Sequence, residues 1–340
     1  MRTVERDKRV DILRFIAIMG IIIAHSSPNG FILQLRNFDV TLMVLLLGTS
    51  FYLTSSDKKI KYLPYVKKRF ERLVVPTWVF LTILFGLFYV ISVVDHVHYY
   101  YSIGQIISSY MLISGIGYVW IMKVFFIIAL VSPFILLLSK KIEDNKTYFL
   151  VIVIGFFIYA GLLHIYDSLN GAPKKIFEHF ILQGLGYTLV AAIGIRIKQL
   201  TKSEVSFLCA LFLVTSALLM VYHNYAPTQT YKYPPGLYYL SYGLFMSFLL
   251  YRLLDLEAIK GIFDNKFVYY ISQNSLWLYF WHIIPVQLIF IYSKGTVFEY
   301  SFLLRLLVIF VVACILTVSH DKLSNKTKVS SKKKIGSVAK

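Results

Sequence analysis

The stretch Asp7–Ser26 reads D-K-R-V-D-I-L-R-F-I-A-I-M-G-I-I-I-A-H-S and predicts a membrane helix with a charged start. Arg14 lies early in its apolar segment and His25 lies at the far end. Eleven residues at a helical rise of about 1.5 Å separate them by roughly 16 Å, about half the thickness of a bilayer core. We therefore expect one helix to hold a fixed cation toward one membrane face and an imidazole toward the other.

The composition is typical of a polytopic membrane protein. Hydrophobic residues make up 58% of the 340 residues and charged residues only 15%, whereas soluble domains carry about 25% charged residues. The net charge of +18 would suggest nucleic acid in a soluble protein. In a membrane protein, basic loops on one side account for it better. Nucleic acid is therefore not an expected partner, whereas membrane lipids are.

Hydropathy predicts an all-α bundle of about ten transmembrane helices. The expected spans are 9–26, 39–56, 73–94, 118–139, 148–165, 178–197, 205–222, 236–254, 267–292 and 301–319. The segment 103–114 is interpreted as a re-entrant or interfacial helix. The two cysteines, Cys209 and Cys314, fall inside separate spans, so we expect neither a disulfide framework nor a metal site.

The loop charges orient these spans. With ten spans and a cytoplasmic N-terminus, 27 of the 35 Lys and Arg residues fall on the cytoplasmic side and five on the outer side. This asymmetry favours cytoplasmic termini at both ends. We expect residues 1–320 to form the membrane domain and residues 321–340 a basic, disordered cytoplasmic tail that rests on anionic lipid.

Ionisable residues inside membrane spans are costly and point to function. Lys123 and Glu178 both belong near the outer face, where they are expected to pair in a structural or a catalytic role. His282, in W-L-Y-F-W-H-I-I-P, suits a hydrogen-bonded packing role as well as a functional one. Arg305 suits either a structural pair or a side chain that snorkels outward. Exposed aromatic side chains, which are frequent in the outer loops, suit either sugar rings or the membrane interface.

His25 is the strongest candidate for chemistry. It lies at the outer end of its helix, where a neutral imidazole can take a proton from a hydroxyl group near pH 7. A second candidate is the basic run that contains Lys67, Lys68, Arg69 and Arg72, just before the third span. Arg69 and Arg72 share a helix face, and paired guanidinium groups grip phosphates. A donor with a phosphate-bearing head and a long thin arm, such as coenzyme A, would reach from these arginines to His25.

These motifs resemble the acyltransferase-3 family of integral membrane acyltransferases. The resemblance rests on R-x10-H at Arg14 and His25, on R-x-x-R at Arg69 and Arg72, and on the order and spacing of shorter matches. The shorter matches are L-R-F-I-A-I, Y-V-W-I-M-K-V-F-F (118–126), K-Y-P-P-G-L-Y-Y-L (232–240) and N-S-L-W-L-Y-F-W-H-I-I-P (274–285). One departure is Trp120-Ile121, where many relatives have W-F or W-Y.

The resemblance implies O-acylation of a surface glycan such as lipopolysaccharide, or of a lipid-linked saccharide, at the bacterial inner membrane. Acetyl-CoA is the expected acyl donor, with no metal. Arg69, Arg72 and Lys68 would bind the donor, and His25 and Arg14 would be catalytic. His25 would act as a base or carry the acyl group transiently. Lys123, Glu178, His282 and Trp120 are the expected acceptor contacts. The alternative is a polysaccharide exporter or flippase.

Overall fold

The computed structural model describes residues 7–338, with side chains to residue 324, and every regular element in that part of the chain is a helix. This confirms the predicted all-α class. The helices are α1 (Lys8–His25), α2 (Gly30–Leu35), α3 (Asp39–Ser55), α4 (Tyr62–Val94), α5 (Ile103–Tyr110), α6 (Trp120–Lys141), α7 (Asn145–Asp167), α8 (Gly171–Ile176), a π-helical turn (Phe177–Leu182), α9 (Gln183–Arg196), a 3₁₀ turn (Ile197–Gln199), α10 (Lys202–Tyr222), a 3₁₀ turn (Thr228–Tyr231), α11 (Leu237–Leu253), α12 (Glu257–Phe263), α13 (Lys266–Gln273), α14 (Ser275–Tyr292), α15 (Val297–Tyr300) and α16 (Phe302–Val338).

Fewer helices meet the length and composition of a membrane span than the sequence predicts. Between residues 7 and 338, eight helices qualify, or nine if the bent pair α11 and α12 is one span. The predicted count of about ten is therefore not reached by this criterion. α1 carries Lys8, Arg9, Asp11 and Arg14 within its 18 residues, and α11 has only 17 residues. The predicted span 267–292 is also divided, because α13 ends at Gln273 and α14 begins at Ser275.

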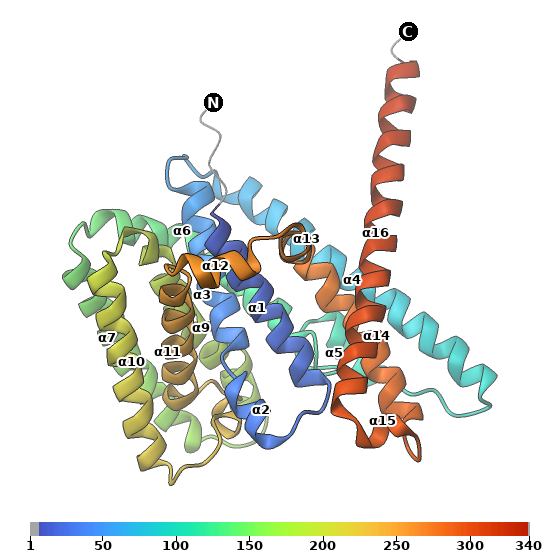
Figure 1. Ribbon diagram of the computed structural model, residues 1–340, viewed down its shortest axis with the longest axis horizontal. Helices are drawn as coiled ribbons and strands as arrows, with labels where there is room; N and C mark the ends of the chain where they lie inside the picture. Colours follow the sequence, from blue (N-terminus) through green and yellow to red (C-terminus); the bar gives the residue numbers. More distant parts are fainter. Residues whose placement is uncertain (1–6, 339–340) are drawn as a thin grey trace.

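The interior of the bundle is built around α3 and α9, which pack tightly against each other and against α1 and α6. Two glycines permit this approach: a Cβ added to Gly48 would lie 2.0 Å from the Ala191 carbonyl oxygen, and one added to Gly194 would lie 2.0 Å from that of Leu45. Small residues at such crossings let membrane helices pack backbone to backbone. By contrast, α7, α10 and α16 expose most of their apolar surface and form the periphery (Figure 1).

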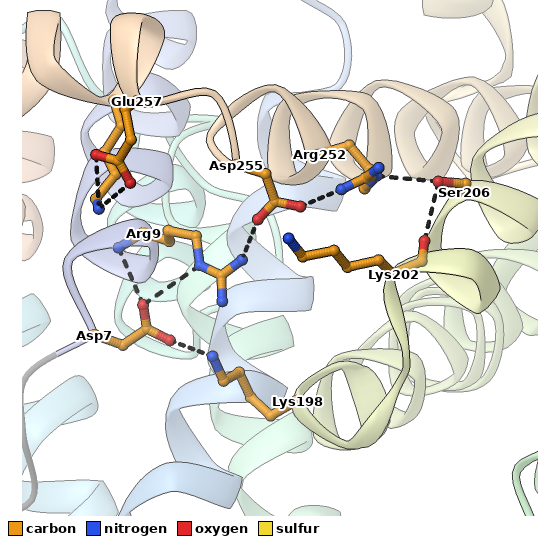
Figure 2. A network of polar contacts seen from close by, with 9 residues as sticks. Asp7, Arg9, Lys198, Lys202, Ser206, Arg252, Asp255 and Glu257 are labelled. Carbon is orange, nitrogen blue, oxygen red and sulfur yellow. Dashed lines mark hydrogen bonds and ion pairs between the residues drawn. The ribbon is translucent and has the colours of Figure 1, made fainter.

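A polar network fixes one end of the bundle (Figure 2). Asp7, which caps α1, binds Lys198 after α9 at 2.6 Å, and Arg9 binds Asp255 after α11 at 2.7 Å. Arg252 completes the network with Asp255. These contacts hold the start of α1 to the segments that follow α9 and α11. His25 lies at the opposite end of this anchored helix.

The last helix begins at Phe302 and continues to Val338. Its end lies on the same side of the molecule as the start of α1 (Figure 1). The helix thus includes residues 321–338 of the segment that the sequence assigns to a disordered tail, and residues 339–340 lie outside the described part. The lysines of this segment are compatible with a helix that continues from a membrane span, because lysine is a good helix former.

Candidate functional site

A cavity of about 170 Å³ opens at the end of α1, and His25 lies in its wall. We call it the His25 cavity. Its walls come from α1, α2, α3, α6 and α14, from the loop before α6, and from the 3₁₀ turn and loop before α11. The residues that line it are Ile21, Ala24, His25, Leu33, Arg36, Asp39, Val40, Gly117, Tyr118, Trp120, Ile121, Gln229, Lys232, Tyr233 and Tyr279.

His25 is positioned by the turn that ends α1. The chain leaves the helix through Ser26 and Ser27, and Ser27 adopts a φ of 53°. Arg305 of α16 donates from Nε to the Ser26 carbonyl and from Nη2 to the Ser27 carbonyl, both at 2.9 Å. Arg305 therefore fulfils the structural role that the sequence allowed for it, and it secures the backbone immediately after His25.

His25 and His282 form a direct imidazole pair. The distance from His25 Nδ1 to His282 Nε2 is 2.8 Å, and the two rings are stacked at an interplanar angle of 16°. The second nitrogen of His282, Nδ1, hydrogen-bonds the Tyr279 carbonyl oxygen. His282 is completely buried, whereas His25 is half-buried and reaches the cavity. The packing role expected for His282 is thus a contact with the candidate base.

Three charged side chains share the His25 cavity. Arg36 donates to Asp39 at 2.7 Å, and the Lys232 ammonium lies 3.6 Å from the same carboxylate. All three are buried, and they leave the lining with one positive charge in excess. Burial lowers the pKa of Lys232 below its ordinary value, although Asp39 opposes this shift. Such a lining favours negative charge that develops or binds beside His25.

Aromatic side chains complete the cavity wall. The Tyr118 ring meets the His25 ring edge to face, with centroids 5.0 Å apart, and Trp120 meets Tyr233 in the same way at 5.1 Å. Burial raises the pKa of the Tyr118 and Tyr233 phenols, so both remain neutral hydrogen-bonding groups at physiological pH. Of the acceptor contacts expected from sequence, Trp120 lines this cavity.

A second cavity, of about 680 Å³, lies against α3, α4 and α6. We call it the basic cavity, because six cations line it and no carboxylate does. They are Lys58, Lys59, Lys61, Lys68, Arg69 and Arg72. Arg69 and Arg72 lie near the start of the 33-residue helix α4, as their spacing predicts, and Arg69 lies 5.0 Å from the centre of the Tyr65 ring. Lys67, on the same helix, does not line the cavity.

Arg14 reaches the wall of the basic cavity rather than the His25 cavity. Its guanidinium donates to Ser50 at 2.8 Å, and Ser50 lines the basic cavity. It also pairs with Asp11 at 3.3 Å, and Asp11 accepts a hydrogen bond from Ser272. This arrangement ties α1 to α3 and α13 at the depth of the basic cavity.

The two cavities share the walls formed by α3 and α6. On α3, Val40 lines the His25 cavity and Leu47 lines the basic cavity; on α6, the corresponding residues are Ile121 and Phe125. At a helical rise of about 1.5 Å per residue, these positions are roughly 6–10 Å apart along the helices. A short layer of buried side chains therefore separates the cavities.

Lys123 and Glu178 are not brought to either cavity wall. Glu178 accepts a hydrogen bond from Tyr166 at 3.0 Å, whereas the buried Lys123 ammonium has no hydrogen-bond partner among the described residues. The expected ion pair between them does not form within 4 Å in this part of the chain. Glu178 lies in the π-helical turn Phe177–Leu182. The same turn contributes Phe180, and the centre of its ring lies 5.6 Å from the Lys123 ammonium.

Sequence reasoning missed several residues of the His25 cavity. Arg36 and Lys232 are two of the cations expected in the outer loops, and Lys232 also begins the match at 232–240, but no local pattern indicates a site role for them or for Asp39 and Gln229. The charge contrast was the available signal, because Arg36 and Lys232 are two of only five cations expected on the outer side. Their convergence depends on the fold: Arg36 follows α2, whereas Lys232 lies nearly 200 residues later, just after a 3₁₀ turn.

A family model described as an acyltransferase domain, Acyl_transf_3, matches residues 7–320. No curated protein and no solved structure matches the chain.

Proposed function

Because the chain belongs to the acyltransferase-3 family, and is thus a multi-pass membrane acyltransferase, we propose that it transfers an acyl group, most simply acetyl, from acyl-CoA to a hydroxyl group of a surface glycan or lipid-linked saccharide. The membrane would be the bacterial inner membrane, with both termini cytoplasmic. One observation carries the proposal: a histidine that hydrogen-bonds a second histidine through one ring nitrogen lies in the wall of a cavity, and one short layer of side chains separates it from a larger cavity lined by six cations.

The donor would bind with its phosphates in the basic cavity. Guanidinium groups bind phosphate oxygens bidentately, and Arg69 and Arg72 line this cavity with Lys68 and three further lysines. The arm of coenzyme A would then pass between α3 and α6 toward His25. Arg14 would hold the polar wall along this route through Ser50.

The chemistry then needs one base and one acid, and His25 supplies both. Its Nε2 takes the proton of the acceptor hydroxyl as the oxygen attacks the thioester carbonyl carbon. The carbon–sulfur bond breaks, the CoA sulfur takes that proton from His25, and the products are an ester and free CoA. In the alternative route, Nε2 attacks the thioester carbonyl carbon, the carbon–sulfur bond breaks, and CoA leaves as a thiolate. The acceptor oxygen then attacks the acyl carbon, the carbon–nitrogen bond to His25 breaks, and the hydroxyl proton ends on the CoA sulfur.

The test uses purified protein in nanodiscs with radiolabelled acetyl-CoA and no added acceptor, so that water takes the place of the hydroxyl. Because a general base typically contributes roughly 10²–10⁴-fold, we expect His25→Ala to reduce CoA release by that order. His164→Ala is the matched control, since His164 is exposed on α7. Equal CoA release by folded wild-type and His25→Ala protein would contradict the proposal. Label retained on the protein would identify the covalent route.

A further inference from the structure

His282 is the only side chain among the described residues that hydrogen-bonds the imidazole of His25. It belongs to α14, about 260 residues from His25 in sequence, and it is 0% exposed. No substrate can reach it, so its function must act through His25. The inference below rests on the proposed role of His25 as a base.

The proton positions in this pair follow from the partner of His282 Nδ1. That partner is the Tyr279 carbonyl oxygen, which can only accept, so His282 Nδ1 carries a proton. If His282 is neutral, its Nε2 has a lone pair and accepts. The proton in the 2.8 Å contact must then belong to His25 Nδ1, and the lone pair of His25 is left on Nε2.

A cationic His282 would reverse this order, but its surroundings disfavour a positive charge. The ring is fully buried and contacts His25 and Tyr279, and no carboxylate lies against it in the described part of the chain. The nearby cavity already has an excess of positive charge from Arg36 and Lys232. Burying another unpaired charge there would be costly.

We propose that His282 is a positioning residue that holds His25 in the tautomer with the proton on Nδ1, so that the lone pair of Nε2 is available to the acceptor hydroxyl. The stacked rings and the Tyr118 edge contact at 5.0 Å restrict rotation of the His25 ring. When Nε2 takes the proton, the resulting imidazolium keeps its Nδ1–H bond to His282, which becomes charge-assisted and therefore stronger. The pair thus stabilises the protonated base without placing a carboxylate beside it.

Two substitutions separate positioning from packing. In His282→Gln, the amide can accept from His25 with its oxygen and donate to Tyr279 with its nitrogen; in His282→Ala, both interactions are lost. We expect His282→Ala to lower kcat for CoA release by roughly 10- to 100-fold with the donor KM unchanged, less than loss of the base itself. His282→Gln should recover most of that loss. His320→Ala is the matched control, because the His320 ring packs against Trp277 of α14, and His320 has no hydrogen bond or ring contact with His25 among the described residues.

A tautomer measurement tests the inference independently of turnover. In protein labelled with ¹⁵N-histidine, assigned by comparison with His25→Gln, we expect His25 to show a protonated Nδ1 and an unprotonated Nε2 in the wild type. In His282→Ala, that preference should be lost.

Each result decides one question. A wild-type His25 with its proton on Nε2, or a folded His282→Ala protein with wild-type kcat, would overturn the positioning role and leave the base role of His25 intact. Equal losses in the Gln and Ala variants would also overturn it, because packing alone would then explain the effect. Failure of the proposed function itself would appear instead as His25-independent CoA release.

Discussion

Replacing the arginines of the basic cavity should weaken donor binding in unequal steps. Arg69 is half-buried beside Tyr65, whereas Arg72 is exposed. A partly desolvated charge-assisted hydrogen bond is worth about 1.5–3 kcal/mol, so Arg69→Gln should raise the donor KM roughly 10- to 150-fold. An exposed, screened charge contributes about 0.2–1 kcal/mol, so Arg72→Gln should raise it no more than about fivefold. Neither change should greatly alter kcat, because His25 lies at the other cavity.

The assay is CoA release as a function of donor concentration, at low and at high salt. Lys67→Gln removes the same charge from the same helix but outside the cavity wall, and its KM should remain within about twofold of wild type because surface charges are largely screened. Salt should weaken the contribution of Arg72 more than that of Arg69. A KM for Arg69→Gln equal to that of Lys67→Gln would refute the assignment of the basic cavity to the donor phosphates.

Three further changes test the structure around the site. Gly48→Ala should destabilise the bundle by about 1–3 kcal/mol or more, because the new methyl group overlaps the α9 backbone; Gly86→Ala, with open space around it, is the control, and thermal unfolding in detergent is the measurement. Arg305→Met should lower kcat several-fold at an unchanged donor KM, because the turn after His25 loses its two carbonyl contacts; wild-type kinetics would contradict this. Lys123→Met should leave the unfolding temperature unchanged or raise it, because a buried unpaired ammonium is replaced by an apolar chain of similar length; a marked loss of stability would show that Lys123 has a structural partner.

Local patterns predicted the features that depend on one helix. The separation of Arg14 from His25 and the shared face of Arg69 and Arg72 follow from helical periodicity, and both pairs occupy the expected helices. The same reasoning predicted a continuous span over 267–292, because hydropathy does not detect the break at Asn274 between α13 and α14.

Contacts between distant segments could not be predicted in this way. The sequence around His282 fits a packing role as well as a functional one, because nothing in α14 alone indicates that His282 contacts the end of α1. Arg36 and Lys232 likewise converge on Asp39 only after α3 and the loop before α11 have packed. One sequence without an alignment gives residue types and spacing, but pairing between helices depends on the tertiary fold.

The hydrogen bonds from Arg305 to the Ser26 and Ser27 carbonyls also have a consequence for biosynthesis. His25 is carried by α1, which leaves the ribosome before α14, the source of its imidazole partner, and before α16, whose arginine secures its backbone. A nascent chain that has inserted α1 through α11 therefore lacks both supports. Catalytic competence would arise only when α14 and α16 have entered the membrane, so that a protein truncated before α16 would be inactive.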